Sequence, residues 1–132
     1  MANGVLGKVY RDGEVICCQG EHANCMYIVQ TGAAEVVRRS GMEDAVVGEL
    51  SNGDIFGEMS IFDRQPRSAT VRARGEARVL TLDKRASMRR VHEDPTLAFR
   101  ILEKLSLRVR RLDEEVAQLR AQVATAVKNP QN

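Results

Sequence analysis

One continuous segment carries most of the information in this sequence: Asp54-Ile55-Phe56-Gly57-Glu58-Met59-Ser60-Ile61-Phe62-Asp63-Arg64-Gln65-Pro66-Arg67-Ser68-Ala69-Thr70-Val71. Gly57 lets the backbone turn and approach a ligand closely. The residues from Glu58 to Phe62 can form one helical turn whose free N–H groups suit an anion. Arg67 follows a proline, and its planar guanidinium can pair with a phosphate. The segment therefore predicts an anion-binding turn.

Two further side chains narrow the ligand class. Ser68 can add a hydroxyl contact to a phosphate. Glu58 would repel a bare phosphate, but it suits a ligand that also presents hydroxyls. Together these residues indicate a nucleotide or sugar phosphate with a free ribose hydroxyl. The alternative is that Glu58 and Arg67 form an ion pair on the surface of a turn.

Short apolar runs and turn residues alternate on both sides of this segment, up to about residue 82. The runs are Val15-Ile16, 26–29, Val36-Val37, 45–47, Val71 and 79–82. The turn signals are Asp12-Gly13, Gln19-Gly20, Thr31-Gly32, Ser40-Gly41, Asn52-Gly53-Asp54 and Arg74-Gly75. This punctuation predicts an antiparallel β sandwich or jelly roll, with a hairpin tip at residues 40–44.

The pattern changes to a helical one after residue 82. Asp83 can cap a short helix that ends near Asp94. Pro95 then favours a new helical start, with Asp94 as the cap before it, and no further Gly or Pro occurs before residue 130. A helix from residue 95 to about residue 127 would be roughly 50 Å long at ~1.5 Å per residue.

A heptad repeat runs along this predicted long helix. Positions a are Leu102, Val109, Val116 and Val123, and positions d are Leu105, Leu112, Leu119 and Ala126. This pattern favours two parallel strands. Arg108 at position g would face Asp113 at position e of the second copy, and their opposite charges attract. Glu115 would likewise face Arg120.

The predicted dimer interface is a heptad seam consisting of Leu102, Leu105, Val109, Leu112, Val116, Leu119 and Val123. The alternative is a single amphipathic helix that lies on the sandwich. We favour a parallel homodimer, because a helix of this length overruns a small sandwich and an exposed apolar seam tends to associate.

Composition excludes several function classes. The 132 residues are 43% hydrophobic and 29% charged, which is typical of a folded domain. The net charge of +2 gives no reason to expect a nucleic-acid partner, and we interpret the Arg pairs at 89–90 and 110–111 as a solvated helix face. No apolar run approaches a membrane span, and residues 1–8 do not resemble a signal peptide.

Metal and catalytic sites are not expected either. His22 and His92 lie far apart, which argues against a metal site and against a cupin-type metalloenzyme. Cys17, Cys18 and Cys25 are expected to be reduced thiols of a cytoplasmic protein, with a Cys18–Cys25 disulfide as the less favoured alternative. No catalytic motif is present, so we expect no enzyme activity.

The segment Phe56-Gly57-Glu58-x-Ser60, followed by residues 66–70, resembles the phosphate-binding cassette of the cyclic-nucleotide-binding domain family. This family includes catabolite-activator-type bacterial regulators, regulatory subunits of protein kinase A and cyclic-nucleotide-gated channels. The resemblance extends upstream to Gly13-Glu14-Val15-Ile16-x-x-Gln19-Gly20-Glu21, to Met26-Tyr27-Ile28-Val29-x-x-Gly32 and to Leu50-x-x-Gly53-Asp54. It covers about residues 8–112.

The resemblance implies a role for each cassette residue. Glu58 would accept the ribose 2′-hydroxyl, and Arg67 would neutralise the cyclic phosphate. The implied cyclic nucleotide-binding set is Phe56, Gly57, Glu58, Met59, Ser60, Arg67, Ser68 and Ala69. The ligand would be cyclic AMP, with cyclic GMP also allowed. No cofactor is implied.

The resemblance also implies an eight-stranded jelly roll followed by a B helix and a C helix that caps the base. Rough alignment puts Leu112 and Asp113 at the base-contacting positions, where the family's polar residues are not clearly matched, and Arg108 lies nearby. We expect a jelly-roll domain with the B helix over 1–94, a capping and dimerisation helix over 95–128 and a tail over 129–132.

The function expected from the sequence is a regulatory sensor that binds a cyclic nucleotide and couples it to the C helix. Its partners would be a second copy and an unknown effector protein. We expect no DNA-binding, kinase or channel domain within this chain. Two alternatives stay open: a dimerising scaffold with a vestigial pocket, and a sensor fragment of a larger transcription regulator.

Overall fold

A computed structural model of the chain describes residues 6–128, which fall into two units, 6–93 and 94–128. The predicted tail at 129–132 lies outside the described residues. The elements in chain order are β1 (Lys8–Tyr10), β2 (Val15–Cys17), β3 (Cys25–Ser40), β4 (Glu43–Leu50), β5 (Ile55–Phe56), α1 (Met59–Asp63), β6 (Thr70–Asp83), α2 (Lys84–Glu93) and α3 (Pro95–Lys128).

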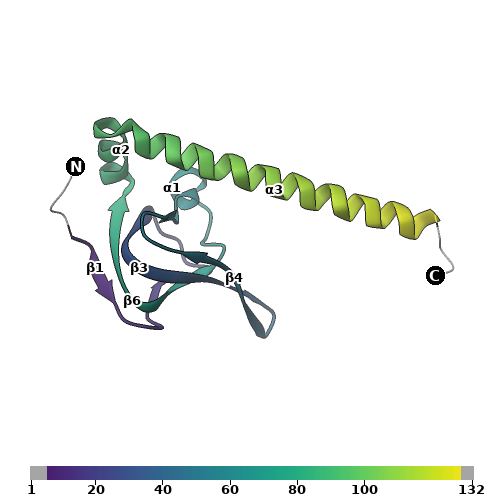
Figure 1. Cartoon of the computed structure of the whole chain (residues 1–132), viewed down its shortest axis with the longest axis horizontal. Helices are drawn as coiled ribbons and strands as arrows, with labels where there is room; N and C mark the ends of the chain where they lie inside the picture. The colour runs from purple at the N-terminus through teal and green to yellow at the C-terminus, as the bar shows by residue number, and fades with distance from the viewer. Residues whose placement is uncertain (1–5, 129–132) are drawn as a thin grey trace. The chain divides into compact units, whose positions relative to one another are not determined.

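The first unit is built on one antiparallel sheet. The strand order is β1-β6-β3-β4, while β2 pairs with β6 and β5 pairs with β3 (Figure 1). The predicted antiparallel β fold with C-terminal helices is confirmed. The described residues form six strands rather than the eight expected from the resemblance, and the sheet is not a closed barrel.

Two of the predicted turns lie inside strands. The Thr31-Gly32 and Arg74-Gly75 signals do not end β3 and β6, which pair from Cys25 opposite Asp83 to Val37 opposite Thr70. The register shifts on either side of Thr31. Gly32 has a φ of 88°, and a Cβ there would lie 2.2 Å from the Glu76 carbonyl oxygen. The glycine therefore permits an irregularity within a continuous strand, where the sequence pattern indicated a turn.

The predicted hairpin tip is present. Strand β3 ends at Ser40, which pairs with Glu43 at the start of β4, so the turn consists of Gly41 and Met42. The ion pair between Arg39 Nε and Asp44 Oδ1, at 3.0 Å, joins the two strands beside the turn.

The core of the first unit lies against β3 and β6. It is mainly aliphatic, with Tyr10, Tyr27 and Phe56 as its rings. Tyr27 on β3 and Phe56 on β5 stack with ring centroids 4.8 Å apart. This stack fixes the end of β5, and the cassette begins at that point. All three cysteines are free.

Both predicted helix caps are present. The Ala86 amide donates to Asp83 Oδ1 at 2.7 Å before α2, and the Thr96 amide donates to Asp94 Oδ1 at 3.1 Å before α3. Helix α3 runs without interruption to Lys128. No helix of the described residues is long and apolar enough to cross a membrane.

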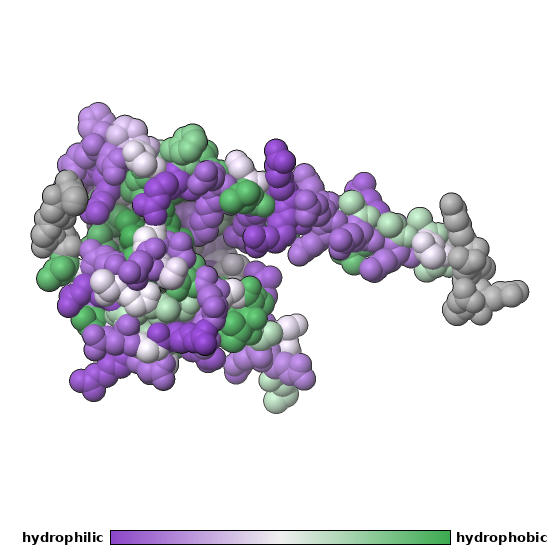
Figure 2. Space-filling view, viewed as in Figure 1, coloured by the Kyte–Doolittle hydropathy of each residue, from purple (hydrophilic) through white to green (hydrophobic). Residues whose placement is uncertain are grey.

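Apolar side chains of α3 are exposed in the single chain. Six of the seven seam side chains are exposed, with exposed fractions from 45% at Val116 to 62% at Leu102 and Val123, and the seventh, Leu105, is half-buried. Figure 2 shows small apolar areas among hydrophilic ones along α3.

Candidate functional site

The cassette residues follow one another between β5 and β6. Strand β5 ends at Phe56, Gly57 turns the backbone with a φ of 78°, and α1 follows. A Cβ on Gly57 would lie only 2.5 Å from Arg67 Nη1, so the glycine backbone is needed for close approach to this arginine. The eight predicted binding residues are thus held on one local structure.

Arg67 is the centre of this structure. Its Nη1 donates to the Gly57 carbonyl oxygen at 2.7 Å, and its Nη2 donates to the Cys25 carbonyl oxygen at 2.8 Å and to Cys25 Sγ at 3.3 Å. The guanidinium carbon lies 5.3 Å from the centroid of the Tyr27 ring. The residue is only 5% exposed, and its Nε has no hydrogen-bond partner among the described residues.

The groups around Arg67 do not fully compensate its positive charge or its hydrogen-bond donors. Carbonyl oxygens, a thiol and a ring face carry only partial charges, so they compensate a buried cation less well than an anion would. A buried N–H without a partner is also unfavourable by roughly 1–3 kcal/mol. A bound anion would remove both deficits, which is the chemistry predicted for Arg67.

Glu58 is also buried, with an exposed fraction of 4%. It is the N-cap of α1, and its Oε2 accepts a hydrogen bond from the Met59 amide at 3.3 Å. Because both Glu58 and Arg67 are buried, the alternative of a surface ion pair is wrong. One amide of the predicted anion-binding turn faces the Glu58 carboxylate.

The other predicted residues differ in exposure. Phe56 and Ser60 are buried, Gly57 and Ala69 are half-buried, and Met59 and Ser68 are exposed. The proposed base-capping residues Arg108, Leu112 and Asp113 belong to α3 in the second unit, so their role stays a prediction.

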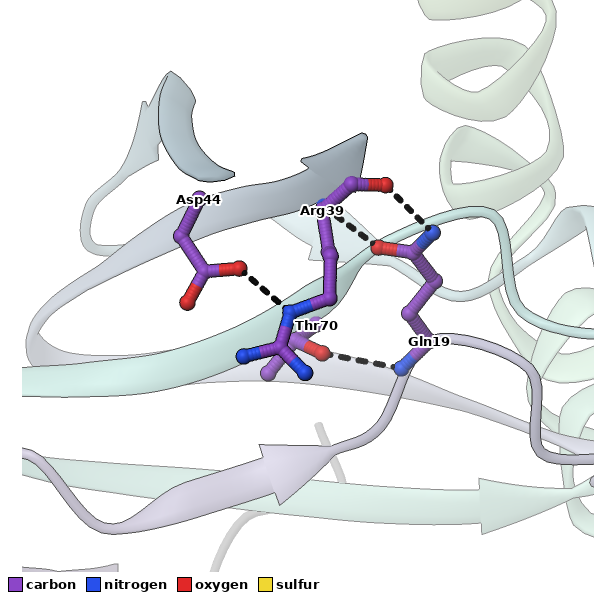
Figure 3. Close-up of polar contacts among 4 residues, drawn as sticks. All are labelled: Gln19, Arg39, Asp44 and Thr70. Carbon is purple, nitrogen blue, oxygen red and sulfur yellow. Dashed lines mark hydrogen bonds and ion pairs between the residues drawn. The ribbon is translucent and has the colours of Figure 1, made fainter. Parts of the chain in front are cut away.

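A loop between β2 and β3 holds the backbone of Arg67. The Gly20 amide donates to the Arg67 carbonyl oxygen, and the Arg67 amide donates to the Glu21 carbonyl oxygen, both at 2.8 Å. Gln19 anchors this loop to the neighbouring strands (Figure 3). The side-chain amide of Gln19 accepts from the main-chain N–H of Arg39 at 2.8 Å and donates to the Arg39 carbonyl oxygen at 3.2 Å. The main-chain N–H of Gln19 donates to Thr70 Oγ1 at 2.9 Å.

Sequence reasoning did not identify the residues that surround Arg67. Cys25 lies 42 residues away in the chain, and its contact depends on the pairing of β3 with its neighbours. One signal was available, because Cys25 and Tyr27 are two residues apart on a strand and share a face. The alternation of side chains along a strand could place Cys25 and Tyr27 on one face of β3, but it could not show that they contact Arg67.

The Tyr27 phenol and the Cys17 thiol both have raised pKa values. Burial, and then the hydrogen bond from the Cys25 thiol, raises the pKa of Tyr27. Burial raises the pKa of Cys17 to about 11, although the positive charge of Arg67 opposes the shift. Neither group therefore supplies a negative charge to Arg67 near neutral pH.

Comparison with known families agrees with this site. Residues 7–94 match the family model described as the cyclic nucleotide-binding domain. The chain belongs to this family. The matched residues include the whole cassette, the β2–β3 loop and every strand of the described residues.

Individual relatives are regulatory proteins. The chain is 40% identical over 87 residues to the cAMP-dependent protein kinase regulatory subunit of Mycosarcoma maydis. The aligned region covers 62% of this chain and 17% of that relative. The chain spans less than a quarter of the length of the curated relatives it matches.

Solved structures share the fold. The Thermus thermophilus catabolite activator protein superimposes with a TM-score of 0.77 and 28% identity, over 85% of this chain and 53% of that one. The regulatory domain of Toxoplasma gondii PKA, solved with cAMP, gives a TM-score of 0.60 and 30% identity, over 73% of this chain and 38% of that one.

Proposed function

We propose that this domain binds cyclic AMP through the cassette and acts as a sensor module. The observation that carries the proposal is Arg67, which is buried and positively charged and whose Nε has no hydrogen-bond partner within residues 6–128. A cyclic phosphate supplies the missing negative charge and acceptor. A relative of similar fold was solved with cAMP, which supports the choice of nucleotide.

Selectivity would come from two side chains of the cassette. Glu58 accepts the ribose 2′-hydroxyl, and this requires its carboxylate to exchange the Met59 amide for the sugar or to bind both. Ser68 is exposed, and its hydroxyl would add a contact to the ligand. A hydroxyl at that position also suits the guanine amino group, so cyclic GMP is the second candidate ligand.

Calorimetric titration with cyclic AMP, cyclic GMP and linear 5′-AMP tests the proposal. Arg67→Ala should weaken cyclic AMP binding by roughly 2–4 kcal/mol, because it removes a charge-assisted contact. Ser68→Ala is the matched control and should cost about 1 kcal/mol, the value of one neutral hydrogen bond. Lack of binding of either cyclic nucleotide at millimolar concentration would exclude a sensor and favour a vestigial pocket.

We further propose that α3 forms a parallel homodimer through the heptad seam. The exposed seam side chains and the complementary pairs Arg108–Asp113 and Glu115–Arg120 support this. A ligand can shift the placement of α3 only if it binds one placement better than another. In this proposal Arg108, Leu112 or Asp113 caps the base and provides that difference, and an effector protein reads the result.

Hydrogen exchange of residues 100–115, with and without cyclic AMP, tests the coupling. We expect slower exchange in the ligand-bound state because the capping contact orders this part of α3. Unchanged protection at saturating ligand would mean that the domain captures the nucleotide without signalling through α3.

A further inference from the structure

Cys25 contacts the guanidinium of Arg67 in two ways. Its carbonyl oxygen and its Sγ both accept from Arg67 Nη2, at 2.8 Å and 3.3 Å. Since Nη2 carries two hydrogens, this one residue accounts for both of them. The thiol in turn donates to the Tyr27 hydroxyl oxygen at 3.5 Å. The Cys25 thiol is therefore one of the groups that position the guanidinium of Arg67.

The other two thiols are differently placed. Cys17 is buried in the core, and burial raises its pKa to about 11. Cys18 is half-buried beside Glu21, and desolvation followed by this carboxylate raises its pKa. Cys25 alone combines partial exposure with direct contact to a cation.

There is no room for an added group between Cys25 Sγ and Arg67. The two atoms Sγ and Nη2 are in hydrogen-bond contact, and the guanidinium is fixed on its other side by the Gly57 carbonyl oxygen. Arg67 is 5% exposed, so displacement cannot be absorbed by a move through solvent. Any atom attached to Sγ must therefore push Nη2 from its position or occupy the space beside it.

We propose that Cys25 is a modification site at which a small disulfide or electrophile blocks anion capture by Arg67, and that bound nucleotide shields the thiol. This inference rests on the proposed function. With a small disulfide such as oxidised glutathione, the Cys25 thiolate attacks one sulfur and forms a new S–S bond. The original S–S bond breaks, and the departing thiolate takes up the proton that Cys25 lost. The carboxylates of the attached group would also compete with phosphate for Arg67.

The test uses the full chain with the other thiols removed, Cys17→Ala together with Cys18→Ser. This variant is treated with oxidised glutathione or iodoacetamide, with and without saturating cyclic AMP, and labelling is followed by intact mass. We expect cyclic AMP to slow labelling at Cys25 at least about tenfold. Modified protein should bind cyclic AMP at least about tenfold more weakly, since one hydrogen bond to a charged group is disturbed.

Two controls separate this effect from loss of structure. Dithiothreitol should restore binding to the glutathione adduct but not to the thioether. Cys25→Ser, in the same background, keeps an oxygen that can accept from Nη2 but has no thiol, so it is the control that the reagents cannot modify. Its binding should be unchanged by both reagents. The unfolding midpoint of the modified protein should match that of the unmodified protein.

The outcomes distinguish the inference from the function on which it rests. If the unmodified variant binds cyclic AMP and the modified one binds equally well, the inference is wrong and the proposed function stands. Resistance of Cys25 to both reagents in the folded protein also overturns the inference. If unmodified wild-type protein binds neither cyclic nucleotide, both are wrong.

Discussion

Replacement of Gly57 by alanine tests whether close approach of the backbone to Arg67 is required. Two effects add in this variant. An alanine with a φ of 78° is strained by roughly 1–2 kcal/mol. Its Cβ would lie 2.5 Å from Arg67 Nη1, so the guanidinium must move by roughly 1 Å to reach ordinary contact. That movement breaks the 2.7 Å bond to the Gly57 carbonyl oxygen, a further loss of about 1.5–3 kcal/mol.

Gly13→Ala is the matched control. Its φ is 80°, so the backbone strain is nearly the same, but a Cβ there meets nothing within 4 Å. Denaturant unfolding should therefore show a loss of about 1–2 kcal/mol for Gly13→Ala and about 2.5–5 kcal/mol for Gly57→Ala.

Calorimetry should show that only Gly57→Ala weakens cyclic AMP binding, by about tenfold or more. If both variants lose the same stability and Gly57→Ala retains wild-type affinity, the close approach to Arg67 has no role in the site. A smaller stability difference with a large loss of affinity would instead mean that Arg67 moves easily, but to a place where it cannot bind phosphate.

Three further predictions concern other parts of the chain. Gln19→Ala should weaken cyclic AMP binding about three- to tenfold in a titration, because it releases the loop that holds Arg67. Arg39→Ala should have little effect, because Gln19 binds only the main chain of Arg39, and equal losses of affinity in the two variants would refute the anchoring role of Gln19. Leu119→Lys should convert a dimer to a monomer in sedimentation at tens of micromolar, and a monomeric wild type would exclude the seam as an interface. Burial raises the pKa of Cys17 from an ordinary value of 9.0 to about 11 in the folded protein, so the contribution of this thiol to the free energy of unfolding is complete below about pH 9 and is lost toward pH 11. Cys17→Ala should therefore reduce the fall of the free energy of unfolding between pH 9 and pH 11, and an unchanged fall would contradict the burial of the thiol.

The features that the sequence predicted are those that depend on near neighbours. The caps at Asp83 and Asp94 use amides two or three residues away, so a side chain and its position suffice to predict them. The hairpin turn after Ser40 is local in the same way. The cassette was recognisable because its residues are consecutive, from Phe56 to Ala69.

The features that were missed depend on strand pairing. A glycine such as Gly32 has the same sequence signature in a turn and in a strand irregularity, and only the partner strand decides between them. For this reason the expected eight short strands merged into fewer and longer ones. The neighbours of Arg67 were hidden for the same reason, since Cys25 reaches it only after β3 has paired.

The span between Cys25 and Arg67 has a consequence for the order of folding. A contact across 42 residues closes a long loop, and long-range β pairing of this kind forms slowly. The proposed anion site is therefore assembled only when β3 and its partners are in place, and a local piece of the chain does not contain it. Interactions that are absent from the folding transition state act on the rate of unfolding. A nucleotide bound at Arg67 should therefore lengthen the lifetime of the folded domain while leaving its rate of formation almost unchanged.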